Sequence, residues 1–132
     1  MIEASTEFLT KAEESLAGAE SEFANGRYNN CANRCYYSSF QAAIAALALA
    51  GVQPTGGVGG EWGHTFVQSH FANDLITRRK LYPSDLREVL SRAIVLRQAA
   101  DYKTAPVSQT QASRALRRAA EFFQAIQGGA AR

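Results

Sequence analysis

The feature that most constrains this chain is the spacing of its apolar residues, which follows the helical repeat from end to end. Apolar side chains recur at steps of three and four over several long segments, and no segment shows the alternation that a strand requires. The chain has 132 residues, of which 46% are hydrophobic, so it can form one core. We therefore expect a single all-α domain over residues 1–132.

Stop signals divide the helical pattern into five expected helices. Asn25 and Gly26 end the first, because both adopt the left-handed conformation that terminates helices. Ser5 is the expected N-cap of that helix. Pro106 separates the last two helices. The expected helices are 4–24, 27–50, 61–77, one that begins at Pro83 or Ser84, and 108–127, with a frayed tail at 128–132.

The second segment, 27–50, is apolar on nearly every face. A helix of this kind is central in a bundle or lies at an oligomer interface. Short connections between long amphipathic helices favour antiparallel neighbours, so an up-and-down bundle is expected. The next stretch, 51–63, contains six glycines and one proline, which indicates a flexible loop. It is not a phosphate-binding P-loop, because no Gly-Lys-Ser/Thr follows it.

Charge and cysteine content indicate the setting in which the chain works. The first 60 residues carry three basic and six acidic groups, and the other 72 carry eleven and six. The basic second half suits a polyanion, and it equally suits an ordinary solvated face. Two cysteines, Cys31 and Cys35, are too few for a disulfide scaffold, so we expect a cytoplasmic protein. An acidic, amphipathic start and the lack of a long apolar run predict no signal peptide and no membrane association.

A polar group interrupts the apolar stripe of the fourth helix. Arg97 follows Leu90 and Ala93 on that stripe, and Asp101 comes one turn later as its natural partner. Tyr102 can add a hydroxyl. An unpaired buried guanidinium costs much free energy, so a tertiary role for the pair is expected. The second helix offers a matching polar set of Asn30, Arg34, Tyr37 and Gln41. A satisfied buried network and a functional site both fit this pattern.

Few other groups are suited to chemistry. His64, beside the glycine loop, is a candidate for acid–base work or phosphate contact. His70 points to a different helix face and is expected to be a packing or surface residue. The two cysteines lie in an apolar stretch, which indicates inert thiols. No ligand spacing matches a zinc site, so we expect neither a metal nor a cofactor.

Two stretches resemble the HEPN domain family (higher eukaryotes and prokaryotes nucleotide-binding). "NGRYNNCANRCYYSSFQAAIAALALAG" is similar to the second helix of such domains, and "LRQAADY" is similar to the Arg-x-x-x-Asp-Tyr signature of a small stand-alone prokaryotic branch. The placement of His64 is also similar. The resemblance implies a four-helix up-and-down bundle with a short additional helix, usually paired as a homodimer. The matching positions are Arg34, Tyr36, Tyr37, Phe40, Arg97, Asp101 and Tyr102.

The resemblance also implies work on nucleotides or RNA. Many members are metal-independent ribonucleases with an Arg-x4–6-His motif, and others are toxins paired with a minimal nucleotidyltransferase. Here the positions for that histidine hold Tyr102, Lys103 and Thr104. A tyrosine, with an ordinary pKa of about 10, is a poor general base at neutral pH. We therefore favour a module that binds a nucleotide, RNA or a partner protein over a ribonuclease with a degenerate motif. Catalytic candidates are Arg97, Tyr102 and His64, and the predicted phosphate-binding polar site is Arg97, Asp101, Tyr102, Arg34 and Tyr37.

Overall fold

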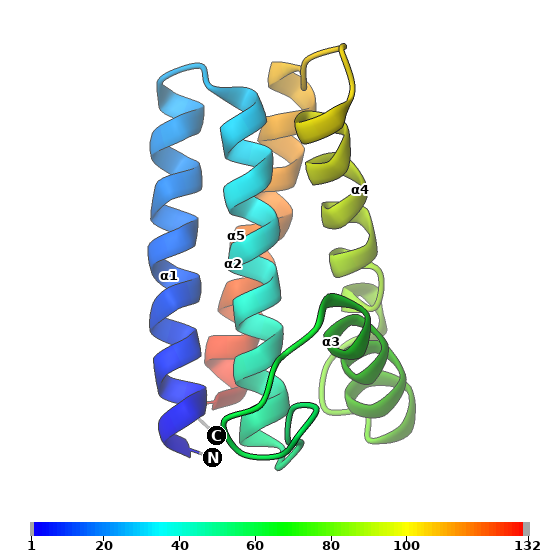
Figure 1. Cartoon of the computed structure of the whole chain (residues 1–132). Helices are drawn as coiled ribbons and strands as arrows, with labels where there is room; N and C mark the ends of the chain where they lie inside the picture. Colours follow the sequence, from blue (N-terminus) through cyan, green and yellow to red (C-terminus); the bar gives the residue numbers. More distant parts are fainter. Residues whose placement is uncertain (1, 131–132) are drawn as a thin grey trace.

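Four long helices form an up-and-down bundle, and a shorter helical segment packs beside it (Figure 1). The computed structural model describes residues 2–130. Within this part the chain is all-α, with one isolated bridge between Thr55 and Glu61 and no strand, as the sequence predicted. No helix in this range is long and apolar enough to cross a membrane. The elements are α1 (Ile2–Ala24), α2 (Tyr28–Leu49), α3 (His64–His70), the π-helix η1 (Phe71–Arg78), the 3-10 helix η2 (Ser84–Leu86), α4 (Val89–Tyr102) and α5 (Gln109–Ala130).

Helix α2 is the centre of the bundle and packs against α1, α4 and α5. Its apolar faces are covered by these three helices, with Ile44 and Leu47 among the most deeply buried side chains. Of the two settings expected for so apolar a helix, the structure gives the central one. Two serine hydroxyls also join α1 to α2. Ser5 Oγ donates to the carbonyl of Ala45 at 2.9 Å, and Ser38 Oγ donates to the carbonyl of Ala12 at 2.8 Å.

Several predicted boundaries are wrong. Ser5 is not an N-cap, because α1 begins before it and its side chain is buried against α2. The third helix begins at His64 rather than at 61, and it widens to a π-helix from Phe71. Regular α-helix in the fourth segment begins only at Val89, after the 3-10 turn. The tail predicted at 128–132 is helical as far as Ala130, and its last two residues lie outside the described range.

The glycine-rich loop 51–63 returns the chain from the end of α2 to the start of α3. Gly56, Gly57 and Gly59 take positive φ angles that other residues rarely adopt, which lets the loop turn back within few residues. Arg79, which follows η1, donates from Nη1 to the carbonyl of Ala50 at 3.0 Å. This bond connects the segment after η1 to the residue that precedes the loop. The result is that His64, the first residue of α3, lies against α2.

Candidate functional site

A cluster of aromatic rings and arginine side chains lies where α2, α3 and α4 meet. Tyr36, Tyr37 and Phe40 come from α2, His64 from α3 and Arg97 from α4. The guanidinium carbon of Arg97 is 5.7 Å from the ring centre of Tyr36 and 5.4 Å from that of Tyr37. These distances are in the range of cation–π attraction. We call these five residues the aromatic–arginine cluster.

Arg97 forms the predicted ion pair with Asp101. Arg97 Nε lies 3.2 Å from Asp101 Oδ2, and the two side chains are 20% and 31% exposed. The contact lacks hydrogen-bond alignment, because the buried Nε has no hydrogen-bond partner among residues 2–130. In the same range the terminal nitrogens of Arg97 make no hydrogen bond or ion pair. Asp101 therefore holds the guanidinium on its Nε side, and the terminal nitrogens of Arg97 remain available to donate to a ligand.

A second arginine, Arg34 of α2, lies beside Tyr37 and the cluster. Its guanidinium carbon is 5.2 Å from the Tyr37 ring centre, so Tyr37 has an arginine near it from each of two helices. Arg34 Nη2 also donates to Asn33 Oδ1 at 2.9 Å. Of the neighbours predicted for Arg97, Tyr37 contacts its guanidinium, His64 is close enough for its pKa to be lowered by it, and Arg34 lies against the same Tyr37 ring.

His64 stacks on two aromatic rings of α2. Its ring centre is 4.7 Å from that of Phe40 and 5.4 Å from that of Tyr36, with nearly parallel planes in both cases. Burial against these rings and the nearby positive charge of Arg97 lower the pKa of His64 below its ordinary value of 6.5. The imidazole is therefore neutral at neutral pH.

A hydrogen bond between the Tyr36 hydroxyl and His64 Nδ1 sets the tautomer of the histidine. Burial and the neighbouring Tyr37 raise the pKa of Tyr36 to about 12 against the opposing effect of Arg97, so the phenol keeps its proton. A phenol that keeps its proton can donate to Nδ1, and this hydroxyl has no other hydrogen bond within residues 2–130. In that arrangement the ring proton of the neutral imidazole is on Nε2.

Tyr102 does not join the cluster, although the sequence placed it there. Its side chain is 79% exposed at the end of α4. Two members of the polar set on α2 also point elsewhere, since the Gln41 amide is hydrogen-bonded with Ser15 of α1 at 2.7 Å and Asn30 contacts Glu22 of α1. A helix turns 100° per residue, so neighbours in sequence face different partners.

Tyr36 and Phe40 were missing from the predicted site, although they form its aromatic floor. Both are nearly buried, and their rings stack with centres 5.7 Å apart. Their spacing of four residues puts them on one helix face, which was a usable signal. It was hidden because α2 is apolar on most faces, so aromatic residues there look like core.

The two cysteines lie in the interior of the bundle, on one face of α2. Cys31 and Cys35 are free and buried, with their sulfurs 4.0 Å apart. The contact with Cys31, together with burial, raises the pKa of the Cys35 thiol, which disfavours a reactive thiolate. No group of three or more His, Cys, Asp or Glu side chains in the described part is arranged to hold a metal ion.

The cluster and its neighbours contain groups that suit an anion. Arg97 belongs to the cluster and Arg34 lies beside it, so two guanidinium groups lie near the imidazole and the aromatic rings, and the Asp101 carboxylate pairs with Arg97. Guanidinium groups with free donors are suited to phosphate oxygens.

Comparison with known families gives one result. The family model described as HEPN domain matches residues 5–128, which is nearly the whole chain and includes every residue of the cluster. A search among curated proteins gives no match.

Proposed function

The chain belongs to the HEPN domain family, and from that premise we propose that it is a binding module for a phosphate-bearing ligand, a nucleotide or RNA. The ligand site is the aromatic–arginine cluster. Arg97 is the main phosphate contact, Asp101 holds it in place, and Arg34 supplies a second positive charge. Association with nucleotides and RNA comes from the family resemblance, and the assignment to this cluster comes from its donors and charge.

The observation that carries the proposal is the bond between Tyr36 and His64. With the protonated tyrosine as donor to Nδ1, the other ring nitrogen of His64 carries a proton, and Arg97 is close enough to lower the pKa of the imidazole. Both groups then offer hydrogen-bond donors to one anion. A proton donor at this position favours holding phosphate oxygens, whereas a general base would need a lone pair there.

A metal-independent ribonuclease is the second candidate, and one observation favours it. The motif histidine is missing in sequence, but folding brings His64 into the same cluster as Arg97. Such an enzyme needs a base for the attacking hydroxyl and positive charge for the phosphate. His64 serves as that base only if ligand binding reverses its tautomer, so we rank this role second.

The test combines binding and cleavage on one set of labelled RNAs and nucleotides, with EDTA present. We expect wild type to bind without cleaving, and Arg97→Gln to weaken binding by roughly tenfold or more. Arg117→Gln is the matched control, because Arg117 is an exposed arginine on α5, outside the cluster. Equal loss in both variants contradicts a specific site. Cleavage that disappears in Arg97→Gln and in His64→Gln establishes the ribonuclease instead.

We also infer a homodimer that associates through α4. The apolar faces of α2 are used inside the bundle, whereas α4 carries two exposed large apolar side chains two turns apart, Val95 at 65% and Tyr102 at 79%. Light scattering at micromolar concentration should give twice the chain mass, and Val95→Glu should give a monomer. Val58→Glu, on the glycine loop, is the control. A monomeric wild type refutes this inference.

A minimal nucleotidyltransferase is the partner that the family resemblance suggests. A gene for one beside this gene would support a toxin–antitoxin pair, and co-purification of the two proteins would test it directly. If co-expressed proteins separate on size exclusion, the partner proposal fails while the ligand site remains open to its own test.

A further inference from the structure

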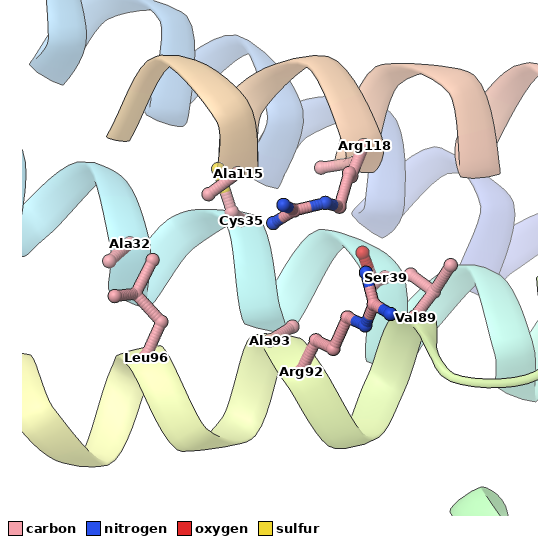
Figure 2. A pocket seen from close by; sticks show the side chains of 10 residues that line it. Ala32, Cys35, Ser39, Val89, Arg92, Ala93, Leu96, Ala115 and Arg118 are labelled. Carbon is pink, nitrogen blue, oxygen red and sulfur yellow. The ribbon is translucent and has the colours of Figure 1, made fainter. Parts of the chain in front are cut away.

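A small hollow lies between α2, α4 and α5 and shares no residue with the aromatic–arginine cluster (Figure 2). Its volume is about 20 Å³, room for a group of a few atoms. Its wall is mostly apolar, with small side chains from all three helices. Among the lining residues, Ser39, Arg92, Leu96 and Arg118 carry the polar groups and the larger apolar side chain that a ligand would meet.

Ser39 puts an unpartnered hydroxyl at the wall of this hollow. The residue is 1% exposed, and its Oγ has no hydrogen-bond partner among residues 2–130. Burial of a hydroxyl without a partner is unfavourable. The serines at positions 5, 15 and 38 are buried too, and the hydroxyl of each has a hydrogen-bond partner on a neighbouring helix. Ser39 therefore differs from the other buried serines of the bundle.

Two arginines from opposite helices converge on the same hollow. Arg92 reaches in from α4 and Arg118 from α5, as Figure 2 shows. Arg92 pairs with Glu88 at 3.2 Å, and Arg118 has no ion pair within the described range. Other charged side chains line the two spaces that share Arg92 and Arg118 with the hollow. Together the set is Arg87, Arg92, Arg114 and Arg118 against Asp85, Glu88 and Glu121, which leaves one positive charge unneutralised. Like charges brought together in this way favour an anion between them.

An open groove leads away from the hollow between α4 and α5. It has a volume of about 620 Å³ and shares Arg92, Leu96 and Arg118 with the hollow. The exposed side chain of Val95 lines it together with Leu96, so part of its floor is apolar. A ligand with its charged end in the hollow thus has room for a short apolar chain in the groove.

We propose that this hollow binds a small organic monocarboxylate. The carboxylate lies between the guanidinium groups of Arg92 and Arg118 and accepts a hydrogen bond from Ser39 Oγ, while its carbon chain lies along Leu96 and Val95. One negative charge matches the one unneutralised positive charge. A phosphate monoester carries more charge than the site can neutralise and would lie close to Glu88. A water molecule would satisfy Ser39 but leave both arginines unneutralised.

Titration calorimetry with sodium hexanoate tests the proposal, since this probe has one carboxylate and a short apolar chain. Hexanamide has the same shape without the charge, and hexyl phosphate has a different charge. We expect hexanoate alone to bind wild type. Arg118→Gln should weaken this binding roughly tenfold, because it removes a charged hydrogen-bond donor. Arg117→Gln, on the same helix but outside the hollow and its groove, should not change it.

Ser39→Ala separates a ligand role from a structural role. The unliganded variant should be as stable as wild type or more stable, because an unpartnered buried hydroxyl is removed, yet it should bind hexanoate more weakly. Failure of hexanoate to bind wild type overturns the proposal. Equal losses in Arg118→Gln and Arg117→Gln also overturn it, as does hexyl phosphate binding as tightly as hexanoate.

Discussion

At the scale of single residues, the candidate site depends on one proton of His64. Tyr36 donates to Nδ1, and this bond requires a neutral imidazole whose other nitrogen carries the hydrogen. Protonation of His64 would put a second donor where the Tyr36 hydroxyl now donates. Acid therefore acts on the geometry of the cluster as well as on its charge.

We predict that the fold loses stability as the pH falls below about 6.5. The pKa of His64 is lowered in the folded protein by burial and by Arg97, so the unfolded chain takes up the proton at higher pH than the folded chain. Stability is then full above the unfolded pKa of 6.5 and falls from there toward the lower folded value. Urea titrations between pH 7.5 and 5 measure this effect. His64→Gln should flatten the profile over that window, and an unchanged slope contradicts the assignment.

The Arg97–Asp101 pair should contribute modestly to stability. Both side chains are partly exposed, so Asp101→Asn is expected to cost about 1 kcal/mol or less. Arg97→Ala also removes the contacts with Tyr36 and Tyr37 and should cost about 2 kcal/mol. Chemical denaturation of both single variants and the double variant gives the coupling energy. A larger loss for Asp101→Asn than for Arg97→Ala would show that the pair is effectively buried.

At the scale of elements, α2 supplies the aromatic rings of the cluster and the glycine loop positions His64 against them. The three aromatic residues of the cluster are on one side of α2, and the rest of that helix fills the bundle core. The loop 51–63 places His64 on those rings, although loop and rings are far apart in sequence. The positions that hold the loop are therefore as important to the site as the residues that touch a ligand.

Gly60→Ala should disturb the site through the loop. A Cβ at position 60 would lie 2.0 Å from the carbonyl oxygen of Thr55, so the backbone must move. We expect a loss of about 1–3 kcal/mol, typical of overpacking, and an altered fluorescence of Trp62 nearby. Gly63→Ala is the matched control, because a Cβ there meets no atom within 4 Å. Similar losses in both variants would locate the effect in chain flexibility rather than in the contact.

At the scale of the whole molecule, the bundle protects its centre from solvent. Cys31 and Cys35 are covered on α2 by packing against other helices, and burial and their mutual contact keep the Cys35 thiol protonated. Cys35 lines the small hollow, whose volume of about 20 Å³ is too small for a bulky reagent, so such a reagent reaches these thiols only when the bundle opens.

We predict that a thiol reagent such as DTNB labels the native protein slowly. The rate should be roughly a hundredfold or more below that of the unfolded chain, because only opened molecules react. It should rise with urea in parallel with unfolding. Rapid labelling of the native protein would mean that α2 separates from α4 or α5 without global unfolding.

Sequence reasoning predicted the helices better than their ends. The long helices α1, α2 and α5 follow from apolar spacing, because that spacing is the condition for burying one face. Apolar spacing did not predict where α3 and α4 begin, because the π-helix and the 3-10 turn are set by packing rather than by local pattern. Ser5 was misassigned because a serine that caps a helix and one that bonds a neighbouring helix look alike in sequence.

By itself the sequence determined the helical fold class, the family and the ion pair of Arg97 with Asp101, which lie one turn apart on the same helix. Only the tertiary structure stacked His64 on Tyr36 and Phe40 and left Tyr102 exposed to solvent. It also placed Arg92, Arg118 and Ser39 around one hollow. The physical reason is the range of the interactions. Contacts within a helix are fixed by a rise and a rotation that sequence spacing encodes. Contacts between helices depend on how whole elements pack, which no local pattern records.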